Sequence, residues 1–313
     1  MANTHRIQLV APLPRIITGT NSGYQKKLNK PPSEETIMRA SAAFSEYYDE
    51  WMAGHHAIAA GMLRQYHDSG YIGRVVTEVG CGTAVLTSRL ILERQREILD
   101  ELGKNGELSK PLTFICLDFS AQMLLLAKAN IAETLGDLIG DLDMQPVRLS
   151  RGDFSISPGG NSEQGLQQLL YRGKPVINVR FECKDASRLK EVEDGDKTDT
   201  LILSYVMHWF RGLERKLGTL QELHAVLPPG GRVISIEEYP LVVRCDLHPG
   251  DQKIQELGGM IEEATTVVPR PHIRELFIKA GFAAQDEVAP DSAIDERIDD
   301  YHVMYGNVYG KER

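Results

Sequence analysis

A glycine-rich turn near residue 80 carries the residues best placed for chemistry. The segment RVVTEVG, residues 74–80, is rich in β-branched side chains, and Gly80 and Gly82 come where it runs into a helix-like segment. Glycines let the chain turn sharply and let a ligand lie against the backbone, because no Cβ is in the way. A strand, a glycine turn and a helix in succession favour a ligand-binding turn over a plain tight turn.

The charge beside this turn narrows the class of ligand. Glu78 precedes the first glycine, and Ala84 stands where a dinucleotide-binding turn usually has its third glycine. A carboxylate would repel a phosphate, whereas it would attract an ammonium or sulfonium group. The pattern therefore points to a cationic nucleoside cofactor, with an ion pair between Glu78 and a nearby arginine as the alternative.

Five segments, in order along the chain, resemble the motifs of the class I S-adenosylmethionine-dependent methyltransferases. They are EVGCGTA, FICLDFSAQMLLLAKAN, FECKDASRL, TDTLILSYVMHWF and LPPGGRVISIEEY. The resemblance covers roughly residues 44 to 309. It implies S-adenosyl-L-methionine as the cofactor and methyl transfer as the reaction.

The resemblance also implies a set of cofactor-binding residues. Asp118 would hold the two ribose hydroxyl groups, since a carboxylate has the acceptor geometry for a diol, and Asp185 would accept from the adenine amino group. A helix cap for Asp118 and a surface acid for Asp185 are the plainer alternatives. The full expected set is Glu78, Gly80, Cys81, Gly82, Asp118, Phe119, Met123, Asp185, Ala186 and Ser204.

Histidine and aromatic residues are candidates for the acceptor side of the site. His208 and Trp209 follow the fourth strand, and a similar pair occurs in related methyltransferases of carboxylic acids, so His208 is the candidate catalytic base. Tyr48, Trp51 and His55 lie on a helical stripe that could fold over the cofactor and substrate, where aromatic faces suit a sulfonium. The same stripe could equally pack on the sheet, and a core position is the alternative for Trp209.

Two further observations concern charge and metal ligands. Glu237 and Glu238, after the fifth strand, could hold a cationic substrate or lie on an exposed edge. The four cysteines are widely spaced, which fits buried, reduced thiols better than a disulfide framework or a zinc site. No metal is therefore expected.

The alternation of short apolar strands with amphipathic helices predicts a doubly wound α/β fold. We expect strands at 74–80, 112–119, 177–185, 198–206 and 231–240, and helices over 87–102, 213–227 and 271–280. Alternating patterns in 283–290 and 301–310 indicate a C-terminal antiparallel hairpin. Together with the resemblance, this gives a mostly parallel, seven-stranded, Rossmann-like methyltransferase sheet.

The chain divides by composition into successive parts. Residues 1–32 form an irregular tail, 33–70 a helical cap, and 71–313 the cofactor-binding domain, with an insertion at about 135–175. A serine at position 33, followed by acids, predicts the start of the first helix.

The overall charge limits the partners. A formal net charge of −9 argues against a protein that grips a phosphate backbone. The chain has no apolar run long enough to span a membrane and no signal-peptide pattern at its start, so we expect a cytoplasmic protein. A small-molecule acceptor with a carboxylate or hydroxyl group is favoured. The alternatives are an RNA or protein methyltransferase and a cofactor-binding protein that no longer methylates, and the oligomeric state cannot be predicted.

Overall fold

The computed structural model describes residues 33–45, 48–140, 149–157, 165–186, 197–210, 212–239, 256, 260, 270–283, 294–297 and 303–312. They fall into two compact units. The first unit holds the described residues from 48 to 204, and the second holds 33–45 together with those from 205 to 312. The tail predicted for 1–32 lies outside the described residues.

The sheet of the first unit has a parallel centre. Four strands are neighbours in the order β5-β2-β1-β6, and each pair of neighbours is parallel. Their bounds are Lys174–Cys183 for β5, Leu112–Asp118 for β2, Val75–Val79 for β1 and Thr200–Ser204 for β6. Every residue of β2 and β6 is buried, as expected of parallel strands covered on both faces. The predicted parallel α/β core is therefore confirmed.

Two more strands extend this sheet beyond the sequence-based expectation. β3 (Phe154–Ser157) and β4 (Leu166–Tyr171) continue it in antiparallel pairing beside β5. Both lie within the segment expected as an insertion. Arg172 and Gly173 join β4 to β5 with φ angles of 49° and 77°, the left-handed pair that a two-residue hairpin turn needs. The described residues carry nine strands in all, so the expected number of seven is wrong.

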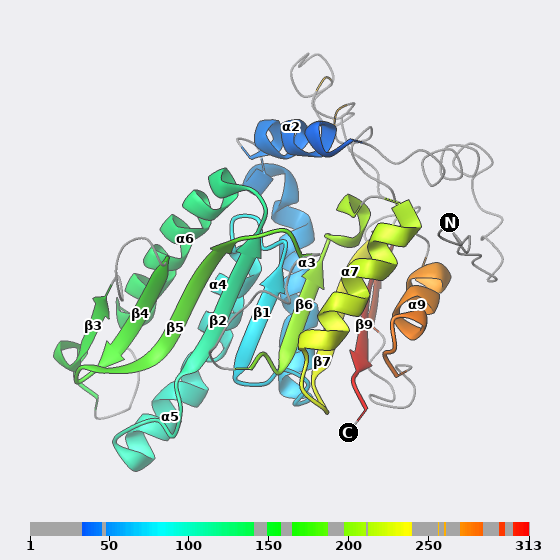
Figure 1. Ribbon diagram of the computed structural model, residues 1–313. Helices are drawn as coiled ribbons and strands as arrows, with labels where there is room; N and C mark the ends of the chain where they lie inside the picture. Colours follow the sequence, from blue (N-terminus) through cyan, green and yellow to red (C-terminus); the bar gives the residue numbers. More distant parts are fainter. Residues whose placement is uncertain are drawn as a thin grey trace. The chain divides into compact units, whose positions relative to one another are not determined.

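The α-helices described in the first unit are α3 (Tyr48–Asp68), α4 (Val85–Glu93), α5 (Gln95–Asn105) and α6 (Ala121–Gly140). α6 packs on β2 and β5, and α4 packs against both α3 and α6 (Figure 1). A single helix was expected where α4 and α5 lie. The helix is interrupted at the buried Arg94, which lies between α4 and α5. Its guanidinium donates to the Gly73 carbonyl oxygen at 2.5 Å and to Glu97 at 2.9 Å.

The second unit has an antiparallel sheet in the order β7-β9-β8. β7 is Arg232–Tyr239, β9 is Val303–Gly310 and β8 is Ile294–Arg297. The predicted antiparallel pairing at the C-terminus is confirmed for 303–310, which pairs with β8 at 294–297, whereas the predicted strand 283–290 lies outside the described residues except for Ala283. Ala283 makes only an isolated bridge to Gly310, and 284–293 lie outside the described residues.

The helices of the second unit are α2 (Glu34–Phe44), α7 (Gly212–Val226) and α9 (Arg270–Lys279), with a short 3-10 turn at Met207–Trp209. α2 begins as predicted, because the Ser33 hydroxyl accepts from the backbone N–H of Thr36 at 3.1 Å. α9 packs on α7, and Phe277 stacks on Tyr309 of β9 with ring centroids 3.9 Å apart. None of the helices in the described part of the chain has the length and apolar character needed to cross a membrane.

Candidate cofactor-binding site

The glycine turn after β1 is held against the end of β2. The backbone N–H groups of Gly80 and Cys81 both donate to the Leu117 carbonyl oxygen, at 2.7 and 3.0 Å. Gly80, Gly82 and Ala84 have φ angles of 68°, 54° and 58°. Ala84 thus adopts the left-handed conformation that costs a residue with a Cβ about 1 kcal/mol, and the surrounding contacts must offset that cost.

Glu78 is buried below this turn and supports the start of α4. Its Oε2 accepts from the Thr87 N–H at 3.2 Å and from the Thr87 hydroxyl at 2.5 Å. Ala84, at the N-cap position, has no side-chain oxygen for this task, so a strand carboxylate supplies the acceptor that caps normally provide. Burial raises the pKa of Glu78 to about 7, against the lowering effect of the Thr87 hydrogen bonds.

Asp118, the last residue of β2, binds the turn directly. Its Oδ2 accepts from the Gly82 N–H at 2.9 Å, and its Oδ1 accepts from the Ser120 N–H at 2.8 Å. A carboxylate has about four lone-pair sites, so these bonds leave acceptor capacity. Burial raises the pKa of Asp118 to about 6 despite the backbone hydrogen bonds.

The two carboxylates make the site strongly acidic. Both are at most 5% exposed, and the charge of Asp118 contributes to the raised pKa of Glu78. Among the described residues, neither forms an ion pair with Lys, Arg or His, so the arginine partner considered for Glu78 is not found there. An uncompensated buried charge is costly, and a cationic ligand would relieve that cost.

Further predicted residues lie at the carboxyl ends of the neighbouring strands. β5 and β2 remain in contact past their ends, since the Lys184 N–H donates to the Asp118 carbonyl oxygen at 3.0 Å and the Cys183 thiol lies 3.6 Å from the Phe119 carbonyl oxygen. This brings the segment that carries Asp185 and the buried Ala186 next to Asp118.

Ser204 and Met123 are two more of the predicted cofactor-binding residues that the structure describes. Ser204 ends β6, which pairs with β1, and its buried hydroxyl has no hydrogen-bond partner among the described residues. Met123 is buried in the first turn of α6, and its N–H donates to the Ser120 hydroxyl at 3.3 Å. Ser120 is therefore the cap of α6, which leaves the Asp118 carboxylate for the turn.

The first turn of α3 packs onto the glycine turn. A Cβ on Gly82 would lie only 2.9 Å from Cζ and Oη of Tyr48, so the phenol ring rests directly on the bare Cα. The Thr83 hydroxyl donates to Asp49 at 2.5 Å, and the Tyr48 hydroxyl lies 3.4 Å from Nε2 of His56.

His55 and Trp51 are the other residues of α3 that were predicted for the substrate side of the site. His55 is half-buried, whereas the buried neighbour of Tyr48 is His56. Trp51 belongs to α3, but its side chain lies outside the described residues. Sequence reasoning left out Asp49, Thr83 and Thr87, because single polar residues at these positions carry no signal until the turn they contact is known.

Three of the four cysteines lie within the described residues, and all three are free thiols. Cys81 and Cys116 are free and buried as expected, whereas Cys183 is free but exposed, because it ends β5 at the rim of the sheet. Cys245 lies outside the described residues. Within those residues, no group of three or more His, Cys, Asp or Glu side chains could hold a metal ion.

His208 belongs to a separate buried cluster in the second unit. Its Nδ1 lies 3.6 Å from Oε2 of Glu237, whose Oε1 accepts from the Met207 N–H at 3.0 Å. The buried ammonium of Lys216 donates to the carbonyl oxygens of Met207 and, at 2.7 Å, of Phe210. Glu237 is only 3% exposed, so the expectation of an exposed edge is wrong for this residue. The Glu238 side chain lies outside the described residues, and Trp209 is half-buried.

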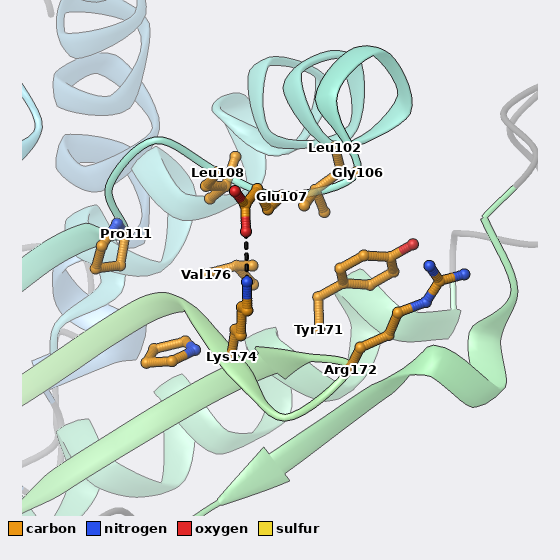
Figure 2. Close-up of a pocket in the computed structure, with 10 residues that line it drawn as sticks. Leu102, Gly106, Glu107, Leu108, Pro111, Tyr171, Arg172, Lys174 and Val176 are labelled. Atoms are coloured by element: carbon orange, nitrogen blue, oxygen red, sulfur yellow. Dashed lines mark hydrogen bonds and ion pairs between the residues drawn. The ribbon is translucent and has the colours of Figure 1, made fainter.

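A surface pocket of about 350 Å³ lies elsewhere in the first unit (Figure 2). It is lined by the end of α5 and by residues at the amino ends of β2 and β5, opposite the edge that carries Gly80 and Asp118. Lys174 pairs with Glu107 across it, and Arg172 pairs with Asp153 at 3.1 Å. The basic groups of this pocket are thus already neutralised, and it lacks the acidic pair.

Comparisons with known proteins give similarity of fold only. No family model matches the chain, and no curated protein matches it. Among solved structures, it is similar to an O-methyltransferase family protein from Burkholderia thailandensis, with 14% identity, 88% of this chain and 60% of that chain covered, and a TM-score of 0.48. It is also similar to a structure described as an O-methyltransferase from Nostoc punctiforme, with 13% identity, 90% and 61% covered, and a TM-score of 0.46.

A third solved structure is similar over most of its own length. It is the magnesium protoporphyrin IX methyltransferase from Synechocystis with bound S-adenosylhomocysteine, with 16% identity, 84% of this chain and 86% of that chain covered, and a TM-score of 0.44. The chain spans only about three fifths of the two structures named before it.

Proposed function

We propose that this chain binds S-adenosyl-L-methionine at the carboxyl ends of β1 and β2 and transfers its methyl group to a small-molecule acceptor. The observation that carries this proposal is the buried pair Glu78 and Asp118, without a cationic partner among the described residues, around a turn whose Gly82 has no side chain. Such a site selects a ligand with positive charge and hydrogen-bond donors.

The described residues fit this cofactor. Asp118 keeps acceptor capacity for two ribose hydroxyl groups after its bonds to Gly82 and Ser120. Ser204 offers a buried hydroxyl that lacks a partner in the described part of the chain. Glu78 contributes negative potential and holds the turn through Thr87. When bound, the cofactor would supply an electrophilic methyl group on a sulfonium.

The protein's own contribution would be chiefly positioning and exclusion of water. Holding two reactants about 3 to 3.5 Å apart in line can supply several kcal/mol without a dedicated base. His208 is the residue we propose as base where the acceptor is a hydroxyl group. Glu237 beside Nδ1 would favour the tautomer with its proton there, leaving Nε2 to accept a proton. A carboxylate acceptor, already ionised at neutral pH, would not need this base.

The acidic net charge of −9 supports a small-molecule acceptor over a nucleic acid. The test is calorimetric titration with S-adenosyl-L-methionine, followed by transfer of a labelled methyl group to a panel of small carboxylic acids and alcohols, to tRNA and to peptides. Asp118→Asn should weaken cofactor binding by about tenfold to a hundredfold, as expected for a lost charge-assisted hydrogen bond. Glu107→Gln, which alters an exposed carboxylate at the opposite edge, is the matched control.

Each outcome has a distinct meaning. Transfer to small molecules, with His208→Ala slowing transfer to alcohols more than to acids, supports the proposal. Transfer to tRNA or peptides alone would mean that the acceptor is a nucleic acid or a protein rather than a small molecule. Binding without transfer to any acceptor would indicate a cofactor-binding protein that does not methylate, and no binding to folded protein would overturn the proposal as a whole.

A further inference from the structure

One strained residue shapes the turn between β1 and α4. Ala84 stands where a dinucleotide-binding turn usually has its third glycine, and its φ angle of 58° lies in the left-handed region. Its side chain is a methyl group, which cannot form a hydrogen bond that would stabilise this conformation. A residue other than glycine keeps such a conformation only when the surrounding structure holds it there. The contacts that hold Ala84 therefore decide the shape of the turn.

The peptide group between Thr83 and Ala84 is held at both of its ends. The Ala84 N–H donates to the Cys81 carbonyl oxygen at 2.8 Å, inside the turn. The Thr83 carbonyl oxygen accepts from the side-chain amide of Asn130 at 3.0 Å. Because the orientation of this peptide group sets the φ angle of Ala84, a change of that angle to a negative value would rotate the group and break both bonds. The two hydrogen bonds together therefore fix the left-handed conformation.

Asn130 reaches the turn from a distant part of the chain. It lies in the middle of α6, 47 residues after Thr83, and α6 packs against α4. Thr83 is fully buried, so its carbonyl oxygen would be a costly unsatisfied acceptor without this donor. The Thr87 N–H, which would bind that oxygen in a regular helix, donates to Glu78 instead. The fold thus leaves the Thr83 carbonyl oxygen to Asn130.

We propose that Asn130 is a positioning residue of the cofactor site: it keeps the Thr83–Ala84 peptide group in the orientation that gives the turn its ligand-binding shape. This inference rests on the proposed function. Thr83 follows Gly82 directly, and the Gly82 N–H donates to Asp118 at 2.9 Å. A rotated peptide group would therefore disturb the part of the turn that meets the ligand. Asn130 acts on ligand binding through the backbone of the turn.

Calorimetric titration with S-adenosylhomocysteine tests this role with two substitutions and their combination. Asn130→Ala removes the donor and keeps a good helix former in α6. It should weaken binding about threefold to tenfold, the factor that corresponds to one hydrogen bond of ordinary net strength. Ala84→Gly should bind at least as tightly as the unaltered protein, because glycine adopts positive φ about as readily as negative φ. In the double variant, the glycine should recover most of the affinity that Asn130→Ala loses.

This recovery separates positioning from a general structural role. A glycine at position 84 makes the unfolded chain more flexible, so it cannot restore the stability of a protein weakened elsewhere, but it can restore the affinity of the folded protein. Asn130→Leu, which keeps a side chain of similar size, is the second variant and should lose affinity and recover it in the same way.

Gln167→Ala is the matched control. It removes another side-chain amide of the first unit, which donates to the carbonyl oxygen of Lys128 in α6 at 3.0 Å. This variant should bind the ligand as the unaltered protein does. Urea unfolding should show that each variant is folded.

The outcomes distinguish this inference from the proposed function. An Asn130→Ala variant that binds as tightly as the unaltered protein would overturn the role of Asn130 and leave the proposed function intact. A double variant that binds no better than Asn130→Ala, or an equal loss of affinity in Gln167→Ala, would do the same. Absence of binding by the folded, unaltered protein would overturn the proposed function, and this inference with it.

Discussion

Glu78→Gln should change the pH dependence of stability in a way that only a buried carboxyl group can produce. Burial raises its pKa from 4.5 to about 7, and each unit corresponds to about 1.4 kcal/mol. A raised pKa means that the folded chain binds the proton more tightly than the unfolded chain. The stability present below pH 4.5 is therefore lost as the pH rises through 7, by roughly 3 kcal/mol in total.

Glutamine cannot ionise and keeps an oxygen for Thr87, so the variant lacks this loss. Urea unfolding at intervals from pH 4.5 to pH 8 would measure it as the difference in free energy of unfolding between the two proteins. That difference should shift by roughly 3 kcal/mol in favour of Glu78→Gln as the pH rises. Glu107→Gln, whose carboxyl group is exposed and paired with Lys174, should show no such shift. Parallel pH curves for the unaltered protein and Glu78→Gln would refute the inference that Glu78 is an uncompensated buried acid.

Three further predictions concern single contacts. Thr87→Val removes the hydroxyl that donates to Glu78 and should lower the free energy of unfolding, measured with urea, by about 1 to 3 kcal/mol. Thr87→Ser keeps a hydroxyl and should retain most of that free energy. A Thr87→Val variant as stable as the unaltered protein would contradict the capping role of Glu78. Lys216→Met leaves Glu237 and two carbonyl oxygens without their buried cation and should cost about 3 to 5 kcal/mol; a loss below 1 kcal/mol in the same assay would be inconsistent with this cluster. The affinity for S-adenosyl-L-methionine should rise between pH 5 and pH 8, as the carboxyl groups with pKa values of about 6 and about 7 ionise; calorimetric affinities that fall or stay level over this range would contradict an acidic cofactor site.

The parts of the fold that follow from local pattern could be predicted from the sequence. The parallel strands β1, β2, β5 and β6 come from apolar, β-branched runs, and the turn at Gly80 and Gly82 comes from residues that adopt positive φ. Asp118 was predicted from the resemblance of its segment to a family motif, and the structure places it at the end of β2, where its carboxylate accepts from the Gly82 N–H in the turn after β1.

Other features depend on contacts between distant parts of the chain. The break between α4 and α5 at Arg94 follows from a guanidinium that reaches Gly73, and nothing in the local helix pattern indicates it. β4 is a strand because it pairs with β5, and β3 because it pairs with β4; without these partners the local sequence of both resembles a long connection.

The same limit applies to the site. Glu78 is predicted to belong to the cofactor pocket, but its hydrogen bonds to Thr87 in α4 could not be predicted, because only the fold puts these two residues together. The contact of Tyr48 with Gly82 joins a helix to a turn 34 residues later in the chain, as does the neighbouring bond between Asp49 and Thr83. An aromatic stripe on a helix is compatible with core packing and with a ligand site, and the spacing alone does not decide between them.

The most direct test of the central claim is a crystal structure of this chain with S-adenosylhomocysteine. It should show the ribose hydroxyl groups on the carboxylate of Asp118 and the amino-acid part of the ligand against the Gly82 backbone. A ligand bound at another place, or one that leaves Asp118 without a ribose contact, would contradict the account.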